Sequence, residues 1–362
     1  MNTYEQIDIK LETLILVLSK LLGTTIIRAD YQTKQLQGGT LGDVRLVTGM
    51  TETIDGEKLS YNVVLKIQKK WERPGDPDSW RREYDLYVSD FNTIFSDSFR
   101  WPECYHAEMS GDEIQLWMEY IDGISGEALR IETLEHAAAE LGRFQGRLYK
   151  QPEILWNIAC LGDAAFMERE YGQWKPETVE YRYLYSNECT VPEHLRRMLI
   201  DTQQQAKTIF TNMKRLPVVL CHRDFWIENI FLSDGKIILI DWDCVGWGFM
   251  GEDIASLIAD DTDVEHLTEY YCMLIQGYCR GLSEYMDIST IENFNIREMI
   301  IIKFGYRILQ KYMFSQSSDV KNQQITALQK IYEMRDTKEI IRAIMKEHGC
   351  IWDEGGNMNA YR

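Results

Sequence analysis

The chain has 362 residues, a length that favours two lobes or domains, and 45% of these residues are hydrophobic, enough to build a core. Its net charge of −18 argues against a general nucleic-acid partner and against an anionic membrane surface. An acidic surface would suit a cationic small molecule, although it also serves simply to keep a protein soluble.

Cysteine usage and the start of the chain point to one compartment. The eight cysteines are scattered, with no C-x-x-C pair, which predicts reduced structural thiols. No signal-peptide pattern opens the chain, and the apolar run at 15–22 is too short to span a bilayer and is broken by Ser19 and Lys20. We therefore expect a cytoplasmic protein.

The N-terminal part alternates apolar and turn-forming segments. Tyr4–Leu22 predicts an amphipathic helix that ends near Gly23, a suitable C-cap, and Thr24–Ala29 predicts a strand. A loop at residues 71–79 precedes a further helix, whose first turn Asp78 or Ser79 could cap.

A glycine-rich turn lies between two predicted strands, at residues 37–44. Backbone with little side chain can approach phosphates and offer N–H groups to them. Gly39 and Gly42 fit the spacing of G-x-G-x-x-G, but Gln37 stands where the first glycine would be. By itself the turn is more often an ordinary connection between strands.

One lysine interrupts the next apolar strand, Leu59–Gln68. Lysine is costly inside such a strand unless a carboxylate neutralises it, so Lys66 predicts a buried ion pair. The following helix, Trp80–Tyr87, offers Glu83 and Asp85 as partners.

The stretch from residue 218 to 258 organises the rest of the chain. Two short strands are joined by the turn Ser233-Asp234-Gly235-Lys236, in which glycine supplies a positive φ. This hairpin brings three polar residues together: Asp224 and Asn229 before and at the start of its first strand, and Asp241 directly after its second.

These three side chains suit phosphoryl transfer, in which a protein mainly positions groups and neutralises charge. Asp224 can accept a proton from an attacking hydroxyl, and Asn229 and Asp241 supply the hard oxygen ligands that magnesium prefers. The alternative is a loop with ordinary Asp and Asn turn residues, which the ordered series of motifs makes less favourable.

The motifs HRDFWIEN at 222–229 and IDWD at 240–243 resemble those of the aminoglycoside phosphotransferase and choline kinase family, small-molecule relatives of the protein kinases. The resemblance implies an α+β, two-lobed protein-kinase-like fold with an antiparallel sheet in the small N-lobe and a large, mainly helical C-lobe. It implies that Asp224 is the catalytic base and that Asn229 and Asp241 hold magnesium.

The resemblance also implies the contacts of the nucleotide, ATP or GTP. Lys66, paired with Glu83, would face the α- and β-phosphates. Main-chain groups of Glu119, Tyr120 and Ile121, after the predicted strand Glu113–Tyr120, would form the hinge that binds the adenine edge.

The same resemblance bears on the structure around the catalytic motif. Asp253 would brace the catalytic loop rather than touch substrate. Arg223 stands where the family usually has a small residue, so its role is open, as is that of Asp243 between a metal ligand and a turn cap.

We expect the N-terminal nucleotide-binding lobe to comprise residues 1–121 and the catalytic and acceptor-binding lobe residues 122–362. The C-lobe is predicted to be helical, with helices at Thr133–Tyr149, Pro192–Arg215, 254–259, 264–286, 291–314 and 321–347, and with a helical insertion that begins at 166–185. Only eleven residues separate Asp241 from Asp253, too few for the long activation segment with which protein kinases hold a peptide.

The predicted function is magnesium-dependent phosphorylation of a hydroxyl on a small molecule. Aminoglycoside-like or other amino-containing acceptors, choline or ethanolamine, and sugars remain open, as does a nucleotide-binding module without turnover. An acidic cluster favours a cationic acceptor, unless it is a solvated helix start: Asp260, Asp261, Asp263, Glu265 and Glu269.

Overall fold

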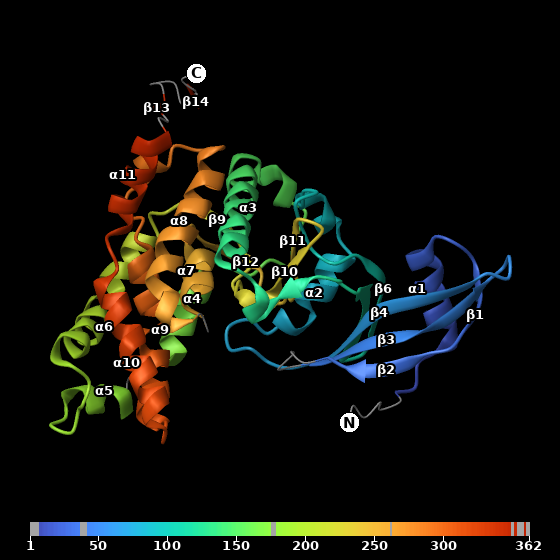
Figure 1. Cartoon of the computed structure of the whole chain (residues 1–362), viewed down its shortest axis with the longest axis horizontal. Helices are drawn as coiled ribbons and strands as arrows, with labels where there is room; N and C mark the ends of the chain where they lie inside the picture. Colours follow the sequence, from blue (N-terminus) through green and yellow to red (C-terminus); the bar gives the residue numbers. More distant parts are fainter. Residues whose placement is uncertain are drawn as a thin grey trace.

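The computed structural model describes residues 7–36, 42–174, 179–260, 263–348, 351–352 and 358–359. A strand-rich lobe and a larger, mostly helical lobe lie side by side (Figure 1). The α+β, two-lobed kinase-like fold expected from the sequence is confirmed.

The N-lobe is built on one antiparallel sheet, with strand order β1-β3-β4-β7-β6 and β2 paired to β3. The long strands β3 and β4 are in register from Gly42↔Gln68 to Glu52↔Lys58. The strands are β1 Ile26–Ala29, β2 Gln32–Gln35, β3 Gly42–Thr53, β4 Lys58–Lys69, β6 Cys104–Ser110 and β7 Glu113–Glu119.

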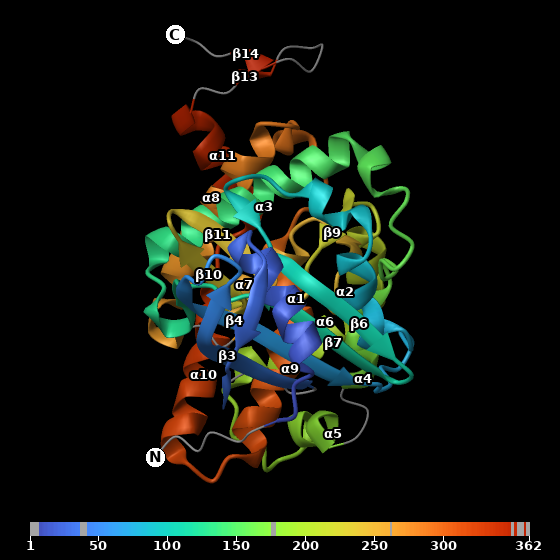
Figure 2. The ribbon, with the colours of Figure 1, turned by 90° about the vertical axis from the view of Figure 1, so that its right-hand side faces the viewer.

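Alternation along β4 separates the two faces of this sheet. Val63 and Leu65 pack on the outer face with helix α1, Leu11–Leu22, which crosses that face in Figure 2. Lys66 points to the other face, toward helix α2, Ser79–Tyr87. The strand therefore delivers the lysine in its interior, Lys66, to the face that meets the C-lobe.

Two details of the N-lobe helices differ from expectation. Helix α1 ends as predicted before Gly23, whose φ of 64° only glycine adopts readily, but it begins at Leu11 rather than at Tyr4. Helix α2 follows Asp78, yet neither Asp78 nor Ser79 caps it through its side chain.

The C-lobe packs its helices around a core that continues to the catalytic stretch. Helices α3 and α8 approach so closely that a Cβ on Gly142 or Gly281 would collide with a backbone carbonyl of the facing helix. Glycine at these two positions permits the contact. The helices are α3 Ile131–Lys150, α4 Phe166–Trp174, α5 Val179–Tyr185, α6 Glu193–Met213, α7 Glu252–Ala259, α8 Leu267–Ser283, α9 Ile296–Phe314, α10 Ser318–Glu333 and α11 Thr337–His348. The single helix predicted over 321–347 is wrong: α10 and α11 are separated by residues 334–336.

Short strands complete the C-lobe. The hairpin β10–β11 lies in a four-stranded sheet of order β5-β11-β10-β8, and β9 pairs with β12. These strands are β5 Phe99–Arg100, β8 Ile124–Ser125, β9 Val218–Cys221, β10 Ile230–Ser233, β11 Lys236–Leu239 and β12 Gly246–Phe249, with β13 Ile351–Trp352 and β14 Met358–Asn359 paired near the C-terminus.

The segment after α2 belongs to the C-lobe core, although it precedes β6 and β7 in the chain. Strand β5 pairs in parallel with β11, and Phe91 and Trp101 pack edge-on against Trp242. The buried residues that this segment adds are Phe91, Ile94, Phe99 and Trp101, and Leu86 at the end of α2 joins them. Within the described residues, no helix is both long and apolar enough to cross a membrane.

Candidate active site

The β10–β11 hairpin sets the geometry of the site. Its turn places Asp234 and Gly235 at φ of 49° and 75°, the pair of positive values that a tight hairpin needs. The backbone N–H of Ile240 donates to the carbonyl of Asn229 at 3.1 Å. Asp241, in a left-handed conformation with φ of 64°, therefore leaves the sheet beside Asn229.

Asp224 and Asn229 are in direct contact. The amide nitrogen of Asn229 donates to the carboxylate of Asp224 at 2.8 Å and to its carbonyl at 2.9 Å. Burial, followed by the nearby carboxylate of Asp241, raises the pKa of Asp224 above its ordinary value. The carboxylate is thus fixed in orientation and made more basic, as a proton acceptor requires.

Lys66 connects the two lobes. Its ammonium group lies 2.5 Å from a carboxylate oxygen of Glu83 and 2.7 Å from one of Asp241. Burial opposes the charge of Lys66, but the two carboxylates outweigh it and raise its pKa. The predicted choice of Glu83 over Asp85 agrees with this geometry, because Asp85 instead pairs with Arg81.

The residues around Asp224 and Asp241 fit a magnesium ion. Because the amide nitrogen of Asn229 is used by Asp224, its oxygen is the end left for a cation. Burial and the neighbouring Asp241 raise the pKa of Asp243 to about 7, a conflict of two neighbouring carboxyls that a divalent cation would relieve. Asn229 and Asp241, with Asp243 close by, are the donors that would hold magnesium; phosphate oxygens and water would complete its shell. In the part of the chain described, no cluster of three or more His, Cys, Asp and Glu ligands forms.

Arg73, which the sequence analysis did not single out, reaches this site from the loop between β4 and α2. Its guanidinium donates to the sulfur of Cys244 at 2.7 Å and lies 4.0 Å from the carboxylate of Asp243. The rings of Trp71 and Phe166 flank it at 4.9 and 5.7 Å. An arginine in a Pro- and Gly-containing loop gives no local signal of such a contact.

Arg223, whose role the sequence leaves open, is buried and contacts other parts of the chain. The residue is 3% exposed, and its guanidinium donates to the carbonyls of Asp163 and Trp247 and stacks on Phe166 at 4.6 Å. It therefore ties the catalytic loop to the segment that follows Asp241.

Asp253 braces the same loop from helix α7. Its carboxylate accepts from the backbone N–H groups of His222 at 2.9 Å and Arg223 at 2.7 Å. Gln145 of α3 also donates to it at 3.0 Å, and Tyr278 of α8 holds Gln145 in turn at 2.5 Å. The brace is thus anchored in the close contact of α3 with α8.

The glycine turn and the hinge are only partly defined. Gly39 lies outside the described residues. Gly42 begins β3, where a Cβ would lie 3.0 Å from the carbonyl oxygen of Ile67.

At the predicted hinge, the N–H of Glu119 donates to the carbonyl of Glu103 at 2.8 Å, and its carboxylate pairs with Arg100 at 2.6 Å. The N–H of Glu119 is therefore not available to a nucleotide unless that bond breaks. Tyr120 is exposed and Ile121 is buried.

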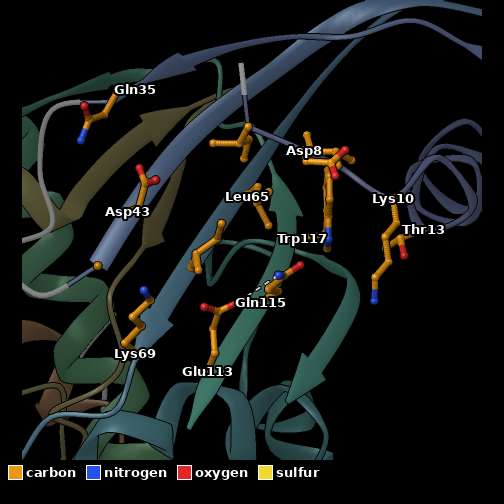
Figure 3. Close-up of a pocket in the computed structure, with 14 residues that line it drawn as sticks. Asp8, Lys10, Thr13, Gln35, Asp43, Leu65, Lys69, Glu113, Gln115 and Trp117 are labelled. Atoms are coloured by element: carbon orange, nitrogen blue, oxygen red, sulfur yellow. Dashed lines mark hydrogen bonds between the residues drawn. The ribbon is translucent and has the colours of Figure 1, made fainter. Parts of the chain in front are cut away.

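A cavity on the N-lobe is distinct from this site. It has a volume of about 640 Å³ and lies on the outer face of the sheet, where Leu65, Ile67 and Trp117 form part of its lining (Figure 3). Lys66 points to the opposite face, so this cavity is not where the lysine–glutamate pair would meet phosphates.

The acidic cluster after α7 is partly neutralised by the protein itself. Asp260 lies 3.7 Å from Arg307, and Asp263 caps the turn that follows and pairs with His266 at 2.7 Å. Lys330 donates to the carbonyl of Glu265; Asp261 lies outside the described residues. Two of these carboxylates, those of Asp260 and Asp263, therefore already have a basic partner within the protein.

The two-lobed fold, with Lys66, Asp224, Asn229 and Asp241 gathered at one site, is typical of a kinase-like phosphotransferase. Residues 76–288, more than half of the chain, match the model of the phosphotransferase enzyme family. The chain therefore belongs to that family, which makes it a small-molecule kinase. No curated protein sequence matches it.

Three solved structures are similar in fold. A microcompartment-associated aminopropanol kinase is 13% identical with a TM-score of 0.52, over 92% of this chain and 98% of that one. The GDP complex of aminoglycoside 2′-phosphotransferase-IIIa is 13% identical with a TM-score of 0.51, over 89% and 98%. The amicoumacin kinase hAmiN, in complex with AMP-PNP, calcium and Ami, is 14% identical with a TM-score of 0.50, over 84% and 89%. At these identities the likeness shows the fold.

Proposed function

We propose that the protein transfers the γ-phosphoryl group of ATP, or of GTP, to a hydroxyl of a small amino-containing acceptor, with magnesium as cofactor. The observation that carries the proposal is the meeting of Lys66 from the N-lobe with Asp241 from the C-lobe, next to the Asp224–Asn229 pair. These groups are the positioning and charge-neutralising set that phosphoryl transfer requires.

Each side chain has a role in the proposed reaction. Asp224 orients the acceptor hydroxyl and takes its proton as the oxygen attacks phosphorus. Lys66, held by Glu83, binds phosphate oxygens of the nucleotide. Asn229 and Asp241 would hold magnesium, which would neutralise phosphate charge. Gly39 and Gly42 border the phosphates, and the main chain at Glu119, Tyr120 and Ile121 lies along the base.

An amino-containing acceptor is supported by two observations. The net charge of −18 attracts cations, and two structural neighbours are named for aminopropanol and for an aminoglycoside. Choline or ethanolamine and sugars are the alternatives within the same chemistry. A nucleotide-binding module without turnover is disfavoured because Lys66, Asp224, Asn229 and Asp241 are all present together.

The test is release of ADP or GDP over a panel of amino alcohols, aminoglycosides, choline, ethanolamine and sugars, with and without magnesium. With the acceptor so found, Asp224→Asn should reduce turnover about 10²–10⁴-fold, the usual contribution of a general base. Nucleotide affinity, measured by calorimetry on the same variant, should stay unchanged.

Two outcomes would contradict the proposal. Equal turnover of wild type and Asp224→Asn would remove Asp224 from catalysis. Tight nucleotide binding with no product from any acceptor would favour the module without turnover.

A further inference from the structure

Helix α9 places a lysine beneath the catalytic loop. The ammonium group of Lys303 lies 3.3 Å from the carbonyl oxygen of Arg223 and donates to the hydroxyl of Ser256 on α7. Lys303 is half-buried, and Ser256 is buried. The lysine is thus fixed between α7 and the residue that directly precedes Asp224.

Arg223 has a backbone conformation that needs support. Its φ of 70° lies in the left-handed region, which costs a residue with a side chain about 1–2 kcal/mol. Such residues persist only where their surroundings hold them.

Two charged side chains hold the main chain of Arg223 from opposite sides. The N–H of Arg223 donates to the carboxylate of Asp253 at 2.7 Å, and its carbonyl accepts from Lys303 at 3.3 Å. Because the carbonyl of Arg223 belongs to the peptide unit that leads into Asp224, its direction helps to set the backbone orientation from which the side chain of Asp224 projects. Asp253 anchors the N-terminal side of this turn, and Lys303 is the matching anchor on its C-terminal side.

We propose that Lys303 is a positioning residue for Asp224 and that Lys303 acts through the carbonyl of Arg223. The inference rests on the proposed function, because Asp224 must first be the group that orients the acceptor hydroxyl. Lys303 stands 79 residues after Asp224 in the chain, in a helix that carries no recognisable motif.

The test compares Lys303→Met, Lys303→Arg and, as a matched control, Lys311→Met. Lys311 is an exposed residue two turns further along α9. A misplaced reacting group costs up to about 100-fold in rate, so Lys303→Met should lower kcat about 10- to 100-fold and leave the KM values for nucleotide and acceptor unchanged. Lys303→Arg should restore part of the loss, and Lys311→Met should match the wild type.

A double variant separates positioning from general destabilisation. Adding Lys303→Met to Asp224→Asn should lower kcat by less than twofold further, because the lysine acts through the carboxylate that is already lost. A full additional loss, or a Lys303→Met effect confined to KM, would overturn the proposal. If Lys303→Met does not fold, Ser256→Ala removes the second anchor of the lysine and should reproduce the loss in kcat in weaker form; unchanged kcat would count against it.

Amide hydrogen exchange tests the positioning without any turnover. In Lys303→Met, the amides of residues 222–225 should exchange at least about tenfold faster than in wild type, while Lys311→Met leaves them unchanged. Unchanged exchange would overturn the inference even if the enzyme is active. If exchange is faster in Lys303→Met but the wild type phosphorylates no acceptor, the result would contradict the proposed function and leave the positioning intact.

Discussion

Single buried ionisable side chains dominate the site. The Lys66 side chain is 12% exposed and contacts one carboxylate from each lobe; leaving such a group unpaired typically costs about 3–5 kcal/mol. Next to it, His222 is 2% exposed, and its Nε2 donates to the carbonyl of Ile240 at 3.0 Å. A neutral imidazole therefore supports the strand end that leads into Asp241.

This burial makes stability depend on pH. Burial lowers the pKa of His222 to about 4, below the value of about 6.5 in an unfolded chain. The folded state thus binds fewer protons than the unfolded state between these values, so the contribution of His222 is complete above pH 6.5 and lost as pH falls toward 4. The loss amounts to about 3 kcal/mol.

The measurement is the free energy of unfolding in urea from pH 7.5 to 4, for wild type and His222→Gln. Glutamine retains a donor for Ile240 but does not titrate, so the advantage of wild type over the variant should change by about 3 kcal/mol as pH falls. Comparison within the pair cancels Asp253, whose pKa burial raises to about 6 and which acts in the opposite direction. Parallel pH curves for the two proteins would contradict the prediction.

Helix α2 is the element that couples the lobes. One of its residues, Glu83, holds Lys66, and its neighbour Arg82 reaches the C-lobe. The Arg82 side chain donates to the carbonyls of Cys160 at 2.7 Å and Asp243 at 2.8 Å, and to the carboxylate of Asp76 at 2.6 Å. A shift of α2 would therefore disturb the lysine–glutamate pair and the segment after Asp241 together.

Removing this anchor should be costly. Arg82→Met leaves the buried carboxylate of Asp76 without its partner, so we expect a loss of about 3–5 kcal/mol in unfolding free energy and weaker nucleotide binding. The matched control is Arg81→Met on the same helix. Its partner Asp85 forms a more exposed i,i+4 pair, worth about 0.3–0.5 kcal/mol. The measurement is the free energy of unfolding of both variants in urea. Equal losses of this free energy in the two variants would show that α2 is not held through Arg82.

At the scale of the whole molecule, the two lobes share a core segment. Residues 86–101 lie before β6 and β7 in the chain, yet they pack with the C-lobe around Trp242. The division at residue 121 stays a prediction, and this packing offers a way to test it.

Two fragments provide that test. Truncating a buried Phe or Trp costs about 3–5 kcal/mol, and a domain has only about 5–15 kcal/mol in total. The fragment 122–362 lacks Phe91, Phe99 and Trp101 and should lose near-UV circular dichroism and cooperative melting. The fragment 86–362 retains them and should melt cooperatively. Equal melting of the two would support a division at residue 121.

The sequence by itself determined the two-lobed fold and brought the hairpin residues together. Asp224, Asn229 and Asp241 lie within eighteen residues, where turn chemistry and strand periodicity are local and leave little choice of geometry. Lys66 was predictable because a charge in an apolar strand requires a partner. Helix limits were less well determined, as at Leu11 and at the break between α10 and α11, because tertiary contacts decide where an amphipathic pattern ends.

Only the tertiary structure decided which distant residues support that site. Arg73, Arg82 and Lys303 lie in loops and helices without a motif, and each has a partner far away in the chain: Cys244 for Arg73 at 171 residues, Cys160 for Arg82 at 78 and Arg223 for Lys303 at 80. Tertiary packing also placed Arg307 of α9 beside Asp260, in the acidic stretch after α7. Such pairings depend on which surfaces the packed helices bring together, so a local pattern of residue types does not predict them.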